Sequence, residues 1–472
     1  MILLTIAITL FGGMAVMAHA RAERRFSLGE WIALAFAAGL SIAVITLFVS
    51  ALVIDKFMVS IPVIVIAVLT AMALPRILKL PRYAKLALKR GPNSFAKLPR
   101  SHRILVGLVI AYALVKMVLA FDMTISHVTR AEDAVLWWEM KTKIFFEYRS
   151  LALDLPRDSP EFFGGSLIRN PFAPLADFWF ICAYTDWPPL LSNMLSPLVF
   201  MSTIFFLAGR LAKIDQRAAA LGVYLFASLP LVFVHAYTSY FNLPLAFFLL
   251  VAAITIDDAL TTEQRARLWP VAIVIVFGAL VRNEGALLIA ALLATMSFAA
   301  IVFCSHRRVA IRRLTGLAPI AVAVAIAFGF NVLVSQLSKT PTLAHGPSGG
   351  DFSRMAKGFS ILFENPKRLL QPIEQLLFRN EYHLLFLLFV VTLPFHFWRV
   401  RTLKPLTAGL LCLMGIFVFV TATADFTLLD THFGMVRFSI ALTPLTAYFI
   451  AREVGERISN SCSLPGPGIT RH

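Results

Sequence analysis

Long apolar runs, separated by short polar segments, recur from one end of the chain to the other. Each run approaches the ~20 residues that an α-helix needs to cross the hydrocarbon core of a bilayer. The pattern predicts an all-α integral membrane protein with about 13 transmembrane helices. We expect them near residues 2–18, 29–54, 57–75, 104–121, 189–208, 218–235, 242–257, 269–282, 285–304, 315–334, 383–398, 405–423 and 436–451.

A basic segment divides this pattern into two parts. Residues 1–103 predict a leader of three transmembrane helices followed by a basic cytoplasmic linker. Residues 104–451 predict one transmembrane core with two long loops, 122–188 and 335–382. The remaining residues, 452–472, read as a polar cytoplasmic tail.

The composition and the charge agree with a membrane protein. With 59% hydrophobic and only 15% charged residues, the chain lacks the polar surface of a soluble globule. The formal net charge of +17 comes mainly from Lys and Arg in one set of alternate loops, most densely at 76–103. Short basic loops stay on the cytoplasmic side, so we expect this set inside and the amino terminus outside. The basic excess is therefore a topology signal with some anionic-lipid contact, and it does not indicate nucleic-acid binding.

Acidic residues follow the first helix of the core, on what this topology makes the extracytoplasmic side. Asp133, with Glu132 beside it, precedes a segment that begins at Ala134 and has the pattern of an amphipathic helix. One interpretation is that Asp133 stabilises the first turn of that helix through the helix dipole. The other is that it is a general base or a metal ligand.

The segment after Asp133 predicts a helix that lies along the outer surface of the membrane. Tryptophans and other apolar residues alternate there with polar ones at helical spacing, and Trp favours the headgroup region. We expect Glu139, Lys141 and Lys143 on the polar side of this helix.

The same loop closes on Thr185-Asp186-Trp187-Pro188-Pro189. The two prolines fix the backbone and prevent helical hydrogen bonds just before the next span. They either serve only chain entry into the membrane or direct Asp186 and Trp187 toward a binding site.

Arg282-Asn-Glu284-Gly285 interrupts the apolar stretch 269–304. This stretch is either one long broken helix or two helices joined by a tight turn. Glu284 either simply pairs with Arg282, or Arg282 binds an anionic phosphate that Glu284 helps to orient.

Two further sets of polar residues fall on the same predicted side, one at residues 425–437 and one at residues 237–242. Arg437, near the outer end of the last span, requires an anionic partner, which is either a lipid-linked phosphate or one of the acids Asp425 and Asp430. His432 is either a proton carrier or a solvated side chain. Tyr237, Tyr240 and Asn242 suit stacking on and hydrogen bonding to a sugar, or membership of the interfacial aromatic belt.

In their order and common side, these motifs resemble the GT-C class of membrane glycosyltransferases, which includes protein O-mannosyltransferases and lipid A aminoarabinose transferases. The resemblance rests on "RAEDAVLWWEMKTK", "TDWPPLL", "RNEG" and "HFGMVRFS", and it covers about residues 104–451. The chain departs from the class in having three spans before this region.

The resemblance implies a GT-C-like core in the cell (inner) membrane, with an extracytoplasmic active site. The enzyme would transfer a sugar from a polyprenyl-phosphate carrier to a hydroxyl of a lipid, glycan or protein. Asp133 would deprotonate the acceptor, and Arg282 and Arg437 would hold the donor phosphate. No cofactor is required, and a divalent metal is compatible with the site.

Other function classes remain open at this point. A transporter or flippase for a lipid-linked sugar would use the same arginines to hold phosphate during translocation, but such proteins commonly carry internal repeats, which this sequence lacks. An envelope polysaccharide polymerase or ligase would differ by using an oligosaccharide diphosphate donor. A structural membrane scaffold is the least specific alternative.

Overall fold

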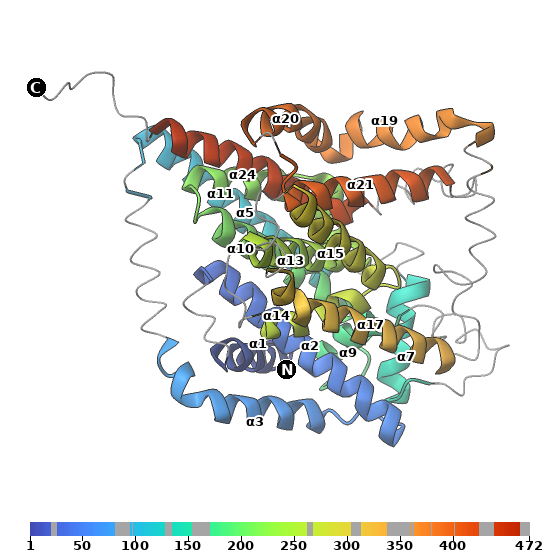
Figure 1. Cartoon of the computed structure of the whole chain (residues 1–472). Helices are drawn as coiled ribbons and strands as arrows, with labels where there is room; N and C mark the ends of the chain where they lie inside the picture. Colours follow the sequence, from blue (N-terminus) through green and yellow to red (C-terminus); the bar gives the residue numbers. More distant parts are fainter. Residues whose placement is uncertain are drawn as a thin grey trace, which may run out of the picture.

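The computed structural model describes most of the chain. The described residues are 1–19, 26–80, 95–96, 98–127, 135–152, 170–261, 268–303, 313–337, 360, 363–378, 380–400, 402–423 and 439–462. Within them the protein is all-α, with 17 α-helices and a few short 3-10 or π-helical turns (Figure 1).

The first part of the chain forms α1 (Ile2–His19), α2 (Leu28–Ile54), α3 (Ser60–Ile77), α5 (Arg100–Ser126), the π-helix η2 (Val135–Glu139), α7 (Met140–Tyr148), α9 (Phe172–Ile181), η3 (Pro189–Leu191) and α10 (Leu195–Leu211). The middle part forms α11 (Gln216–Ala227), α12 (Pro230–Tyr237), α13 (Asn242–Thr261), α14 (Trp269–Leu280), α15 (Gly285–Val302), η4 (Thr315–Leu317) and α17 (Ala318–Leu337). The last part forms η6 (Pro366–Leu369), α19 (Leu370–Phe378), η7 (Asn380–Tyr382), α20 (Leu385–Val400), α21 (Pro405–Thr423), η8 (Ser439–Leu442) and α24 (Thr443–Cys462).

Nine of the described helices are long and apolar enough to cross a membrane, and the bent pair α11 and α12 adds a tenth span if it is counted as one. The chain is therefore a multi-pass membrane protein. The predicted number of 13 is not reached among the described helices. Two predicted spans correspond to α14 and α20, which have only 12 and 16 residues, and α24 carries charged residues along its second half.

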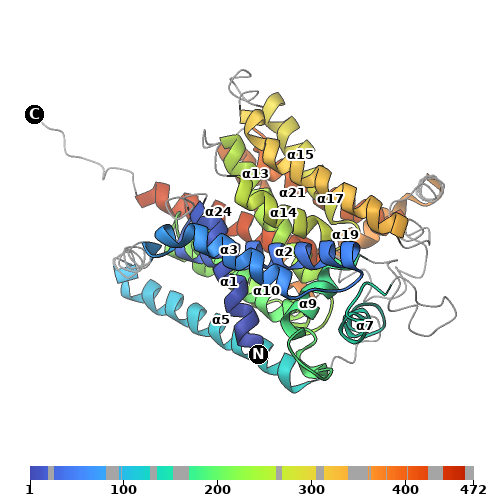
Figure 2. The same cartoon turned by 90° about the horizontal axis from the view of Figure 1, so that it is seen from below.

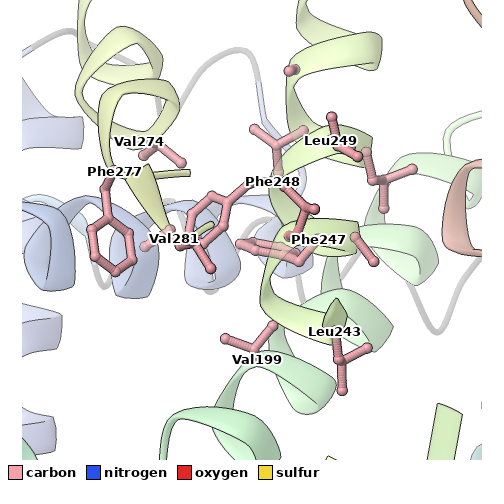
Figure 3. Packing of buried hydrophobic residues seen from close by; sticks show 14 of the residues in the cluster. Val199, Leu243, Phe247, Phe248, Leu249, Val274, Phe277 and Val281 are labelled. Carbon is pink, nitrogen blue, oxygen red and sulfur yellow. The ribbon is translucent and has the colours of Figure 1, made fainter. Parts of the chain in front are cut away.

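The centre of the bundle is α13, of which 94% is buried against other helices. Phe248 of α13 packs edge to face on Phe277 of α14 with ring centroids 5.4 Å apart (Figure 3). By contrast, α3 and α5 are only 17% and 22% buried. Both lie at the periphery, α3 along the bottom in Figure 1 and α5 at the lower left in Figure 2. Their apolar faces are the ones that a bilayer would cover.

Of the three N-terminal helices, α1 and α2 pack directly on the rest of the protein, and α3 packs on α1 and α2. α1 and α2 cross at glycines, since a Cβ on Gly13 would lie 1.5 Å from the carbonyl oxygen of Ala35, and one on Gly39 would lie 1.8 Å from that of Thr9. Such close backbone approach is how small residues join membrane helices. α2 also contacts α9, α10 and α14. One hydrophobic core thus includes residues of the predicted leader and of the predicted transmembrane core.

The stretch 269–304 contains two helices rather than one. α14 ends at Leu280 and α15 begins at Gly285. The turn is tight, because the Gly285 N–H donates to the carbonyl oxygen of Arg282 at 3.0 Å. A Cβ at Gly285 would lie only 2.8 Å from the carbonyl oxygen of Ala279, so glycine suits this position.

A bend of 71° separates α11 from α12, where the sequence pattern predicts one continuous span over 218–235. Pro230 is the first residue of α12, and Leu229 before it has extended backbone angles. Because proline lacks an N–H and disfavours helical geometry in the preceding residue, the helix breaks there.

Loops predicted on the cytoplasmic side meet at one end of the bundle, which we call the ion-paired end (Glu30, Arg210, Asp258, Arg452 and Glu453). Arg210 Nη1 lies 2.9 Å from Asp258 Oδ2 and 3.5 Å from Glu30 Oε1. Nearby segments are joined in the same way, since Arg452 Nη1 lies 2.9 Å from Asp257 Oδ2. Several of these charged groups are buried, and their ion pairs offset part of the free-energy cost of removing them from water.

Loops predicted on the extracytoplasmic side also meet, at what we call the opposite end (Trp138, Asn170, Ser192, Phe241 and Arg282). Asn170 N–H donates to Asn283 Oδ1 at 2.9 Å, and the rings of Trp138 and Phe241 lie 4.9 Å apart. Figure 1 places α7, near this end, at the right, and the carboxyl end of α24, near the ion-paired end, at the left. Within the described residues, the parts of the loops that the sequence assigns to alternate sides lie at two spatially separate ends.

Candidate functional site

Several of the predicted site residues lie outside the described residues. Asp133, Glu132 and Arg437 are among them, as are Asp425, Asp430 and His432. The predicted meeting of an acidic residue with two guanidinium groups therefore remains a prediction. The described part of the site is built around Arg282.

Arg282 lies in the turn between α14 and α15 and is 8% exposed. Its Nε donates to Glu284 Oε1 at 2.5 Å, within the turn. Its Nη1 donates to Asn242 Oδ1 at 2.7 Å, at the first residue of α13. Three of the predicted binding residues are thus in direct contact, and the pairing of Glu284 with Arg282 is confirmed.

An aromatic pair covers the guanidinium. The Arg282 Cζ lies 5.8 Å from the ring centroid of Trp138, and Trp138 packs edge to face on Phe241 at 4.9 Å. A guanidinium beside an indole gains cation–π attraction. We call Asn242, Arg282, Glu284, Trp138 and Phe241 the Arg282 cluster.

Trp138 is carried by η2, a π-helical turn that precedes α7. Single π-helical turns are frequent at functional sites. The segment after Asp133 is therefore helical as predicted, but most of its predicted polar side is buried. Glu139 and Lys141, expected on a solvated side, are 8% and 1% exposed, because η2 and α7 pack against other elements, including α9. Lys143 does remain accessible, with 43% side-chain exposure.

The partner of this segment is α9, a buried helix that the prolines at 171 and 174 gave no reason to expect. Every residue of α9 is buried. The helix contains one charged residue, Asp177, which is 1% exposed and accepts the N–H of Leu195, the first residue of α10, at 2.9 Å. Asp177 is a single acid inside an apolar segment, and this indication of a buried polar site was missed in the sequence.

Glu139 and Asp177 form a buried carboxyl pair beside the amino end of α10. Glu139 Oε1 accepts the hydroxyl of Ser192 at 2.9 Å, while Glu139 Oε2 and Asp177 Oδ2 have no hydrogen-bond partner among the described residues. Burial raises the pKa of Glu139 above its ordinary value. Burial raises the pKa of Asp177 well above its ordinary value, and the neighbouring Glu139 raises it further. Burial and the repulsion between two nearby carboxylates both disfavour the ionised forms of these groups.

The remaining predicted residues fall around this region. Tyr240 is 4% exposed and packs on His235 with ring centroids 5.0 Å apart, whereas Tyr237 packs edge to face on Phe233 at 5.6 Å. Asp186 is exposed and accepts the hydroxyl of Thr185.

Trp187 packs on Phe146 of α7 at 5.7 Å. Among the described residues, no hydrogen bond joins Asp186 to Asn242, Arg282 or Glu284. The Asp-Trp-Pro-Pro segment thus anchors the loop against α7, and the structure does not bring it into the Arg282 cluster.

Metal ligands are not gathered in the described part of the chain, where no group of three or more His, Cys, Asp or Glu side chains could hold an ion. The described thiols, Cys182 and Cys412, are free. Comparison of the chain with family models, with curated proteins and with solved structures returned no match. Any assignment of function therefore depends on the site itself.

Proposed function

We propose that the chain is a membrane glycosyltransferase that moves a sugar from a polyprenyl-phosphate donor to a hydroxyl of a lipid, glycan or protein. The reaction would take place on the extracytoplasmic face of the cell membrane. The observation that supports this most is the buried Arg282, which Asn242 and Glu284 orient beside Trp138. An arginine with little solvent contact and fixed orientation is suited to binding a phosphate.

In the proposed reaction, the acceptor oxygen attacks the anomeric carbon of the sugar and gives up its proton to the carboxylate of Asp133. The bond between the anomeric carbon and the phosphate oxygen breaks, and the polyprenyl phosphate leaves with the electron pair. Negative charge grows on the phosphate as this bond breaks. A positioned guanidinium stabilises this charge more in the transition state than in the ground state.

The neighbours of Arg282 have separate roles in this proposal. Asn242 and Glu284 hold the guanidinium from two different segments and so limit its movement. Trp138, which is buried beside the guanidinium, holds it in place through cation–π attraction. Arg437 is the proposed second contact to the donor phosphate, and Glu132 is the alternate base.

The test is a transfer assay with the purified full chain in vesicles and a polyprenyl-phosphate-linked radioactive sugar. Asp133→Asn is expected to abolish transfer, and Arg282→Lys to lower it strongly because a lysine cannot form the same two contacts. Asp122→Asn, which removes an exposed acid at the end of α5, is the matched control and keeps full activity. Full transfer by Asp133→Asn, or movement of the donor between leaflets without any glycosidic product, would overturn the proposal.

A further inference from the structure

A lysine lies inside the apolar part of α5. Lys116 is the only charged residue between Arg103 and Asp122 of this 27-residue helix. α5 is one of the least buried helices of the protein. An ionised group within a span is costly, so its partners indicate what it does there.

The described partners of Lys116 are aromatic. Its Nζ lies 4.0 Å from the ring centroid of Phe233 on α12 and 5.8 Å from that of Tyr112, one turn earlier on α5. No carboxylate of the described residues lies within ion-pair distance of Lys116. Ring faces attract an ammonium group, but they carry no net charge to balance it.

α12 contacts both α5 and α13, the helix that carries Asn242 of the Arg282 cluster. Phe233 faces α5, whereas His235 is fully buried and packs on Tyr240. Residues two apart in a helix point about 200° apart, so these two side chains leave α12 on nearly opposite sides. A ligand at Lys116 is thus separate from the proposed donor site.

The surface next to Lys116 is apolar and exposed. On α5, Leu108, Val115 and Leu119 are 63%, 56% and 42% exposed. In a multi-pass membrane protein, such a face contacts acyl chains. Lys116 lies ten residues, about 15 Å, before the end of α5 at Ser126. Because this helix of about 40 Å exceeds the ~30 Å hydrocarbon core, Lys116 lies about 10 Å inside the core, and a flexible lysine side chain covers much of that depth by extending toward the headgroups.

We propose that Lys116 binds the phosphate of an anionic phospholipid at the seam between α5 and α12. The acyl chains of this lipid would lie along the exposed face of α5, and Tyr112 and Phe233 would hold the ammonium in place. The site supplies one positive charge and an apolar flank, which matches a phospholipid headgroup and its chains. The binding stands independently of the proposed sugar transfer.

Photo-crosslinking in vesicles tests this site directly. The full chain is reconstituted in phosphatidylcholine with equal amounts of photoreactive phosphatidylglycerol or photoreactive phosphatidylcholine of the same chain length. Labelling of the peptide 104–126 is then quantified by mass spectrometry. We expect phosphatidylglycerol to label this peptide about fivefold more than phosphatidylcholine, because the attraction of one basic residue to an anionic headgroup favours binding by about that factor.

The variants separate this site from a general charge effect. Lys116→Gln is expected to lose the preference, and Lys116→Arg to keep it. Lys143→Gln, which removes an accessible lysine from the same end of the bundle, keeps the preference and is the matched control. The fold of each variant is checked by comparing its elution in size-exclusion chromatography with that of the wild type. Lys116→Met serves as an apolar replacement if Lys116→Gln fails to fold.

Three results would overturn the proposal. A retained preference in well-folded Lys116→Gln or Lys116→Met would exclude Lys116 as the phosphate contact. An equal loss of the phosphatidylglycerol preference in Lys143→Gln would mean that net charge, and not a contact at Lys116, causes the preference. Displacement of the label by inorganic phosphate, or by polyprenyl phosphate at lower concentration than by phosphatidylglycerol, would assign the site to a different occupant.

Discussion

Arg282 and Asn242 lie forty residues apart in the sequence and are joined by a hydrogen bond of 2.7 Å from Nη1 to Oδ1. Asn242 is the first residue of α13, the most buried of the candidate membrane spans, and Arg282 follows α14. The bond therefore fixes the guanidinium relative to the centre of the bundle. A side chain held in this way is oriented before any ligand arrives.

Removing the Asn242 acceptor should destabilise the protein. Asn242→Leu keeps a similar volume but leaves a buried guanidinium N–H without its partner, at a cost of about 1–3 kcal/mol. The expected result is a lower midpoint of thermal unfolding in detergent, followed by intrinsic fluorescence. Thr423→Val, which removes a hydroxyl bonded only within its own helix, is the control and changes little. An unchanged midpoint for Asn242→Leu would mean that the contact does not hold Arg282.

Glu453 at the ion-paired end should be required for stability. It is 3% exposed, and its carboxylate lies 2.9 Å from His396 Nδ1 and 2.8 Å from Arg399 Nη2. Glu453→Gln removes the charge that these two groups share. Because Arg399 keeps its ion pair with Glu456 at 2.6 Å, the cost should lie below the about 3–5 kcal/mol of leaving a buried charge unpaired. Thr407→Val, which removes only the hydroxyl beside His396 Nε2, should cost less. Equal unfolding midpoints for Glu453→Gln and the wild type would contradict this account.

The carboxyl pair Glu139 and Asp177 should make stability depend on pH. Burial raises the pKa of both groups above their ordinary values of 4.5 and 3.8. A carboxyl whose pKa is raised by folding binds its proton more tightly in the folded state. Its contribution is therefore fully present below the ordinary values and is lost as the pH rises through the folded-state values.

The measurement is the unfolding midpoint as a function of pH, upward from about pH 4. The double variant Glu139→Gln and Asp177→Asn should flatten this dependence, since neither amide titrates. Glu147→Gln, an exposed acid on α7, is the control and leaves the dependence unchanged. The account fails if the double variant and the wild type give parallel curves.

Cys182 should be nearly unreactive in the folded protein. It is 7% exposed, and burial raises the pKa of its thiol to about 11. Since the thiolate is the nucleophile, little of it is present at neutral pH. We expect slow labelling by a membrane-impermeant maleimide, and fast labelling of Thr185→Cys in a Cys182→Ser background, because residue 185 is exposed. Comparable rates for the two thiols would contradict the packing of α9.

The sequence pattern predicted the helices well where apolar runs are long. It placed the two ends of α2, α13 and α21 within a few residues, and the distribution of basic residues separated the loops that meet at the two ends. These features depend on local hydrophobicity and on charge, which can be read directly from a sequence. The turn at Arg282 could also be predicted, because three polar residues interrupt an apolar stretch there.

The sequence pattern failed where tertiary packing decides whether a residue is buried or exposed. Glu139 and Lys141 read as the polar side of a surface helix, but α9 covers this segment, and nothing local to Glu139 encodes that contact. The break before Pro230 was missed because both of its flanks are apolar. Lys116 and Asp177 did carry a signal, since Asp177 is the one charged residue of α9 and Lys116 is the one charged residue in the apolar stretch between Arg103 and Asp122.

The most direct measurement of the central claim is an experimental structure of the full chain with a non-hydrolysable polyprenyl-phosphate sugar bound. The account predicts that the phosphate contacts Arg282 and that the carboxylate of Asp133 faces the anomeric carbon from the same end of the bundle. A phosphate bound away from Arg282, or an Asp133 that opens toward the ion-paired end, would contradict it.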